Sequence, residues 1–282
     1  MLGIGKILAP VAFSEECRGA VRQAAMLACR FGSKLTLVHV LEPVTYAFSG
    51  WEAPFQVADL TQQREADTRQ RLDSFFTAEL GGAAAEKVIL EGDPATEIVS
   101  LAHGEKMDLI VMPTRGYGPF RRMLLGSVTA KVLHDASCPV WTGVHMEEAV
   151  GAEQAPIRRV ACAVDLGPQT RAALGWAAGM AQAWAADLTI LHALTVDPES
   201  ESRQALTELA RDQISEHQRA LGTQAEVYIE FGRLPDAVTL PAGRIAADLL
   251  VIGRGHGSGA AGRLPTHAYT IIRESPCPVV SV

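Results

Sequence analysis

Two glycines and a serine stand where a short apolar run gives way to a helical pattern, and this combination can hold an anion. The run Leu109–Met112 is closed by Pro113 and predicts a buried strand, and the helical pattern begins near Gly126 and Ser127. Gly116 lets the intervening backbone come close to a bound group, while a helix start adds unpaired N–H groups. We therefore expect a phosphate here, with Ser127 capping the helix.

An ordinary strand–loop–helix connection, whose glycines serve only the turn, fits the same residues and stays open as the alternative. Three arginines flank the loop and are either phosphate contacts or solvated side chains: Arg115, Arg121 and Arg122.

The other reactive residue types form no catalytic or metal-binding pattern. The cysteines lack the spacing of metal ligands, and we interpret them as small core residues in a reducing compartment: Cys17, Cys29, Cys138, Cys162 and Cys277. No Ser/His/Asp or Cys/His order recurs, and the glycine loop has no lysine, unlike a Walker P-loop. His39 and His192 occupy matching strand positions, which favours a packing role. We expect no catalytic residue and no metal.

Length and charge narrow the class of protein. The 282 residues exceed the usual size of one domain, so two domains are expected. A net charge of −7 and a pI near 5.6 argue against a nucleic-acid partner. No apolar leader opens the sequence, and no run reaches the roughly 18 apolar residues of a membrane span. We expect a cytoplasmic protein with no membrane partner.

The second half of the chain repeats the first. Leu188–Ala193 matches Leu35–Val40, Asp248–Ile252 matches Asp108–Met112, and Pro276–Val279 matches Ser137–Val140. Residues 143–156 lose periodicity and have the composition of a linker. We therefore predict domain 1 at residues 1–144, a linker at 145–156 and domain 2 at 157–282.

Within the first copy, strands alternate with helices, which is typical of a parallel α/β sheet. Strands are expected at residues 6–11, 34–41, 87–90, 109–112 and 140–144. Helices are expected at 14–31, 60–80 and 95–103, and from 126 onward.

Copy one alone carries an aromatic stretch between Pro43 and Leu60, because the corresponding part of copy two is shorter. Its members are Tyr46, Phe48, Trp51 and Phe55. They either pack over helix ends as a satellite core or form a lid or a partner-binding surface, and the sequence does not separate these two roles.

Gly116, Gly126-Ser127 after nine intervening residues, and Ser137-Cys138-Pro139-Val140 resemble the ATP-loop signature of the universal stress protein family, G-x2-G-x9-G-[ST]. Pro113 stands where that signature has its first glycine. The resemblance implies two tandem, open, five-stranded parallel sheets of order 3-2-1-4-5 with helices on both faces. This is the Rossmann-like, adenine nucleotide alpha hydrolase-like fold.

The resemblance also implies where a nucleotide would bind, at the carboxyl ends of strands 1 and 4. The candidates in domain 1 are Pro10, Val11, Val40, Met112, Arg115, Gly116, Gly126 and Ser127. The candidates in domain 2 are Val164, Asp165, Gly253, Gly255, His256 and Thr266. Copy one has Ala12 where the family has an aspartate, and copy two has Pro265-Thr266 where it has Gly-Ser.

By this resemblance the protein is identified as a stress-response regulator that binds ATP or another adenine nucleotide. One alternative is a scaffold that binds no nucleotide and docks to proteins, in which Asp165 only caps the following helix. A weak ATPase is a third hypothesis. The last strands, Val140–Thr142 and Val279–Ser281, are expected to pair within the chain, as they pair between subunits in the family's dimers. Protein partners and a homodimer are left open.

Overall fold

The computed structural model describes residues 2–43, 53–114, 125–143, 156–195, 200–254 and 266–282. The first copy contains β1 (Lys6–Pro10), α1 (Glu15–Phe31), β2 (Lys34–Leu41), α2 (Ala53–Phe75), α3 (Thr77–Leu80), β3 (Ala85–Glu91), α4 (Pro94–Gly104), β4 (Leu109–Val111), α5 (Ser127–Asp135) and β5 (Val140–Thr142). The second contains β6 (Arg159–Val164), α6 (Thr170–Trp184), β7 (Asp187–Leu194), α7 (Ser200–Leu221), β8 (Glu226–Phe231), α8 (Leu234–Arg244), β9 (Leu249–Ile252), α9 (Thr266–Glu274) and β10 (Val279–Ser281).

The strands follow the order β3-β2-β1-β4-β5-β10-β9-β6-β7-β8. Each half is therefore a parallel sheet of order 3-2-1-4-5, as predicted, and its strands pair in matching registers. The predicted pairing of the last strands is also confirmed, because β5 and β10 form an antiparallel ladder. That ladder joins the two five-stranded sheets into one continuous sheet of ten strands.

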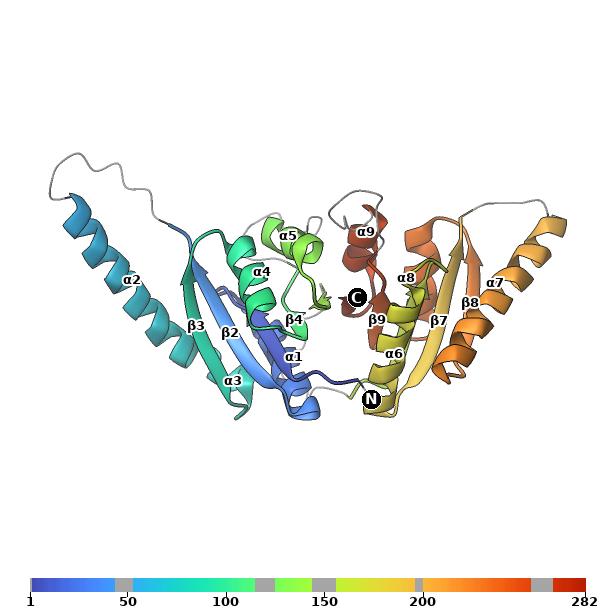
Figure 1. The fold of residues 1–282 in the computed structure, drawn as a ribbon, viewed down its shortest axis with the longest axis horizontal. Coiled ribbons are helices and arrows are strands. Elements are labelled where there is room, and N and C mark those ends of the chain that lie inside the picture. Colours follow the sequence, from blue (N-terminus) through green and yellow to red (C-terminus); the bar gives the residue numbers. More distant parts are fainter. Residues whose placement is uncertain (1, 44–52, 115–124, 144–155, 196–199, 255–265) are drawn as a thin grey trace.

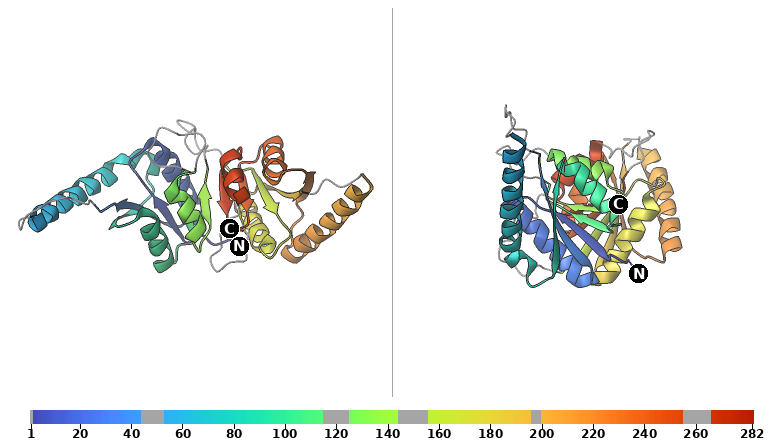
Figure 2. Two further views of the ribbon diagram at one scale, coloured as in Figure 1. Left: turned by 90° about the horizontal axis from the view of Figure 1, so that it is seen from above. Right: turned by 60° about the vertical axis from the view of Figure 1, so that its left-hand side comes forward.

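Helices cover both faces of this sheet, and each face has one hydrophobic core that runs through both copies. Ile7 and Ala9 of β1 point to the face covered by α1, α2, α6 and α7, whereas Leu8 points to the face of α4, α5, α8 and α9. The long helices α2 and α7 lie at opposite ends of the molecule (Figure 1), and the view from above shows the two halves on either side of the central strands (Figure 2). None of the helices in the described ranges is long and apolar enough to cross a membrane.

Matching hydrogen bonds recur in the two copies. The Asp108 carboxylate accepts bonds from the backbone N–H groups of Gly5 and Lys6, which start β1. Asp248 does the same for Arg158 and Arg159 at the start of β6. The backbone N–H groups at the start of the two central strands are thus satisfied in the same way.

The start of the charged helix and the cap of α5 differ from the sequence-based prediction. The charged helix was expected from Leu60, but α2 begins at Ala53, so Phe55 lies in a helix and not in a loop. A proline at the second residue, Pro54, is compatible with a helix start because the first N–H groups have no intrahelical partner. Tyr46, Phe48 and Trp51 lie outside the described residues, as does the predicted linker except for Pro156.

The cap of α5 also differs from the prediction. Gly126 occupies the N-cap position with an extended backbone (φ −61°, ψ 145°), and no side-chain capping bond forms. Ser127 is the first helical residue and is exposed, so its predicted role as the cap is wrong.

One arginine ties the two copies together beside the central ladder. Arg254 follows β9, and its guanidinium donates to the carbonyls of Ala136, Cys138 (2.6 Å) and Ser281 (3.4 Å). Ala136 and Cys138 belong to the connection from α5 to β5 in the first copy. Burial lowers the pKa of Arg254, so its positive charge is removed from water and depends on these carbonyls.

Replacement of Arg254 by alanine is expected to lower the free energy of unfolding by about 1–3 kcal/mol, because buried carbonyl groups lose their donor. Urea titration followed by circular dichroism measures this change. Arg233→Ala is the matched control, since Arg233 is exposed and forms a surface ion pair with Asp236. Equal effects of the two substitutions would show that the bridge between the copies contributes nothing.

Candidate functional site

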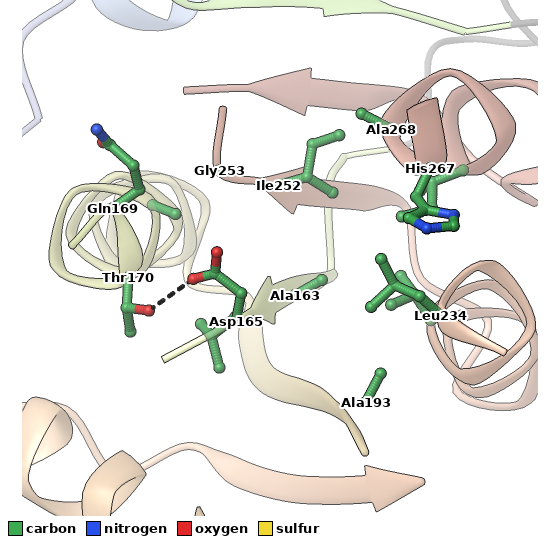
Figure 3. A pocket seen from close by; sticks show the side chains of 14 residues that line it. Ala163, Asp165, Gln169, Thr170, Ala193, Leu234, Ile252, Gly253, His267 and Ala268 are labelled. Atoms are coloured by element: carbon green, nitrogen blue, oxygen red, sulfur yellow. Dashed lines mark hydrogen bonds between the residues drawn. The ribbon is translucent and has the colours of Figure 1, made fainter. Parts of the chain in front are cut away.

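A small pocket lies in the second copy at the carboxyl ends of β6, β7 and β9 (Figure 3). Its volume is about 100 Å³, and α6, α8 and α9 complete its walls. Most of the lining is apolar, and the polar side chains in it are Asp165, Gln169, Thr170 and His267. This is the edge of the sheet where open α/β folds bind ligands.

The Asp165 carboxylate directly follows β6 and is held in place by the turn that leads to α6. Its Oδ1 atom accepts bonds from the Gly167 N–H (2.9 Å) and from the Thr170 hydroxyl (3.3 Å). The alternative role of Asp165 as the cap of α6 is wrong, because the N-cap residue is Gln169 and no side-chain capping bond forms; Asp165 instead stabilises the turn before the helix. Asp165 is exposed and lines the pocket, so the same carboxylate can also accept a bond from a ligand.

Two further residues fix the pocket floor. The imidazole Nδ1 of buried His192 lies 2.8 Å from the Val164 carbonyl, which anchors the end of β6. His39 makes the same contact with Val11 in copy one, so both histidines have the predicted packing role. Gly253 follows β9, and a Cβ atom there would lie 3.3 Å from the Gln169 Cβ. A larger residue at this position would crowd the start of α6.

Larger side chains occupy the matching place in copy one. Four positions that line the pocket in copy two carry small residues, and the first copy has a bulkier one at each: Ala163 against Pro10, Ala193 against Val40, Gly253 against Pro113, and Ala268 against Thr129. Pro10, Val11 and Met112 are buried and Val40 is half-buried. These candidate residues do meet at the carboxyl edge, where Val11 belongs to the core on one face of the sheet and Met112 and Val40 to the core on the other.

Aromatic and cationic side chains crowd the same edge of copy one. Ala12 takes the position of Asp165, and its N–H donates to the Cys17 sulfur. The next residue, Phe13, packs its ring 4.7 Å from the ring of His39, and the guanidinium of Arg71 lies 4.0 Å from the Phe13 ring. Burial, with the positive charge of Arg71, lowers the pKa of His39. Copy one therefore lacks the carboxylate and has side chains over the strand ends.

Two internal hydrogen bonds link the described ends of the predicted phosphate loop of copy one. The Gly126 N–H donates to the Thr114 carbonyl (2.9 Å), and the Thr129 hydroxyl donates to the Pro113 carbonyl (3.0 Å). The Thr114 hydroxyl is buried and has no hydrogen-bond partner among the described residues. The Gly126 N–H is thus used within the turn, whereas a phosphate contact by the rest of the loop stays a prediction. Arg115, Gly116, Arg121 and Arg122 lie outside the described residues.

Of the copy-two candidates, the structure brings Val164, Asp165 and Gly253 together in the pocket. Thr266 begins α9, whereas Gly255 and His256 lie outside the described residues. The sequence missed several lining residues that belong to no motif: Gln169, Thr170, Ala193, Leu234, His267 and Ala268. Alignment of the two halves would have drawn attention to Ala193 and Ala268, because both are smaller than their counterparts. In the described parts of the chain, no three His, Cys, Asp or Glu side chains gather where they could hold a metal ion.

An ion pair joins α4 and α5 in copy one. Asp93, the N-cap of α4, accepts bonds from the Thr96 N–H (2.9 Å), the Thr96 hydroxyl (2.5 Å) and the Lys131 ammonium (2.9 Å). The hydrogen bonds from Thr96, together with Lys131 of α5, lower the pKa of Asp93 to about 2. In copy two Arg233 takes the N-cap position of α8 and forms no side-chain capping bond.

Comparison with known proteins matches both halves of the chain to one family. The model of the Universal stress protein family matches residues 3–142 and again residues 156–282. A universal stress protein of Thermus aquaticus is 35% identical over 127 residues, which cover 45% of this chain and 89% of that protein. Universal stress protein MJ0531 of Methanocaldococcus jannaschii is 32% identical over 139 residues, with coverage of 48% and 79% respectively.

A solved structure matches the full length of the chain. The crystal structure of a universal stress protein from Archaeoglobus fulgidus has a TM-score of 0.68, covers 99% of this chain and 96% of that chain, and is 21% identical. At this identity the likeness shows a shared fold.

The Asp93 link predicts a dependence of stability on acid pH. Because the pKa of Asp93 is lower in the folded state, its contribution is complete above the unfolded value near 4 and is lost as the pH falls toward 2. The difference in unfolding free energy between the wild type and Asp93→Asn should therefore be constant above about pH 5 and shrink between pH 4 and 2. Urea titrations at a series of pH values measure it, and a difference that stays constant down to pH 2 would contradict the link.

Proposed function

The chain belongs to the universal stress protein family, and from this premise we propose that its second half binds an adenine nucleotide, with ATP as the first ligand to test. The observation that carries the proposal is the pocket of copy two. Its place at the carboxyl ends of β6 and β9, its carboxylate at Asp165 and its close backbone approach at Gly253 all suit a nucleotide.

Each part of the pocket has a role in this proposal. The apolar floor, with Ala163, Ala193 and Ile252, offers a surface for a purine ring. The Asp165 carboxylate accepts hydrogen bonds from a ribose hydroxyl or an amino group. The volume of about 100 Å³ is well below the roughly 300–1,000 Å³ of pockets for whole drug-sized ligands, so the pocket encloses one part of the nucleotide. The remaining part extends beyond it.

Binding is proposed for copy two and not for copy one. Pro10, Val40 and Thr129 are bulkier than the pocket residues at the matching positions of copy two, and Ala12 offers no carboxylate. Copy one would then act as the constant partner of a ligand-dependent half. This arrangement combines the regulatory and the docking hypotheses: the crowded half presents a surface to protein partners, and the ligand modulates its neighbour. We propose no catalytic step.

Isothermal titration calorimetry of ATP into the full chain tests the proposal. Asp165→Asn keeps an acceptor for Gly167 and Thr170 but loses the charge, and it should weaken ATP binding by about tenfold or more. Gly253→Val should remove binding, because its side chain crowds Gln169 across the pocket.

Asp187→Ala is the matched control, since it also removes one exposed acidic charge from copy two. Asp187 begins β7, at the amino end of the strand and away from the pocket, so ATP affinity should not change. Melting temperatures of all variants establish that they fold. Absence of heat with the wild type at millimolar ATP would refute the proposal, and release of ADP over many turnovers would instead favour the weak ATPase.

A further inference from the structure

The pocket of copy two has two titratable residues among its described lining, and they stand on opposite walls. Asp165 comes from the end of β6, and His267 comes from the first turn of α9. Figure 3 shows Asp165 and Thr170 on one side and His267 on the other, with Ala163 and Ile252 between them. The pocket is therefore polar at two ends and apolar in the middle.

We propose that His267 binds the anionic group of the ligand, a phosphate in the case of a nucleotide, and so fixes the direction in which the ligand lies. This inference rests on the proposed function, and it assigns the residue that distinguishes a phosphorylated ligand from an unphosphorylated one.

The charges of the lining lead to this assignment. A carboxylate repels an anion, so the ligand turns a hydrogen-bond donor toward Asp165 and its phosphate toward another wall. Among the described lining residues, His267 is the one whose side chain can carry a positive charge. An imidazole can also donate a hydrogen bond to a phosphate oxygen when it is neutral.

The arginine nearest to the pocket in sequence already donates its hydrogen bonds to other groups. Arg254 directly follows the lining residue Gly253, but its guanidinium donates to the carbonyls of Ala136, Cys138 and Ser281. Those bonds hold its charge at the junction of the two copies. The phosphate contact in the described part of copy two therefore falls to His267.

The position of His267 differs between the two copies in a way that fits this role. Its counterpart in copy one is Val128, which packs against the hydrophobic core. Copy one also has a glycine, Gly126, at the residue before its helix, where copy two has Pro265. Proline has no N–H to donate to a phosphate, and a histidine two residues later supplies a donor from its side chain.

The test compares ligands that differ in their phosphate alone. Affinities of adenosine, AMP and ATP are measured by calorimetry for the full-length wild type and for His267→Val, which installs the residue of copy one. We expect AMP and ATP to bind the variant about tenfold or more weakly, because a charge-assisted hydrogen bond is lost, and adenosine to bind within about twofold of the wild type. His267→Lys should restore the affinity for AMP.

The possible outcomes separate this inference from the proposed function. If the wild type binds none of the three ligands, the proposed function fails and the inference fails with it. If adenosine binds but AMP binds no more tightly, or if His267→Val leaves AMP affinity unchanged, the inference alone is wrong. An equal loss for adenosine and AMP would show that His267 only shapes the wall of the pocket.

Discussion

The antiparallel ladder between β5 and β10 is the contact on which the rest of the structure depends. Three residues on each strand pair across it, and all six are buried. Without the ladder, each half would expose the backbone of an apolar edge strand, which favours association with other chains. Its geometry requires Gly143 just after β5, because a Cβ atom there would lie 2.9 Å from the Pro278 Cα. Each of the two hydrophobic cores runs through both copies because the ladder joins the two halves of the sheet. The Arg254 bridge adds polar bonds beside the ladder.

The two copies share the same scaffold, and they differ in the volume of the side chains at the carboxyl edge of the sheet. The aspartates before β4 and β9 and the histidines of β2 and β7 make the same bonds in both copies, since each satisfies backbone groups of the central strands. At the carboxyl edge of the sheet, the two copies differ by a few methyl and ring groups at matching positions. Ala163 and Ala193 line the pocket of the second copy, and the first copy has the bulkier Pro10 and Val40 at the matching positions. Interiors are close-packed, so such small volume differences are enough to open or fill a cavity of about 100 Å³.

The sequence predicted the strands and the two copies because apolar runs such as Leu109–Met112 and their repetition carry that information locally. The strand order and the paired edges were expected from the resemblance to the family. It failed at the start of α2, where Pro54 and the aromatics resembled a loop, and at Ser127, where Gly126 took the capping position. The pocket was predicted only in part. Asp165 and Gly253 belong to a recognisable pattern, but Leu234 and His267 lie on helices whose approach is set by tertiary packing. No local signal distinguishes such residues from other helical side chains.

The intramolecular ladder has a consequence for stoichiometry. When a one-domain protein pairs with itself, both partners come from the same gene, so a change in one crevice appears in the other as well. Here the two halves are made in equal number by a single chain, and each can accept substitutions that its neighbour does not share. A molecule built in this way keeps two different halves together in a fixed one-to-one ratio at any dilution.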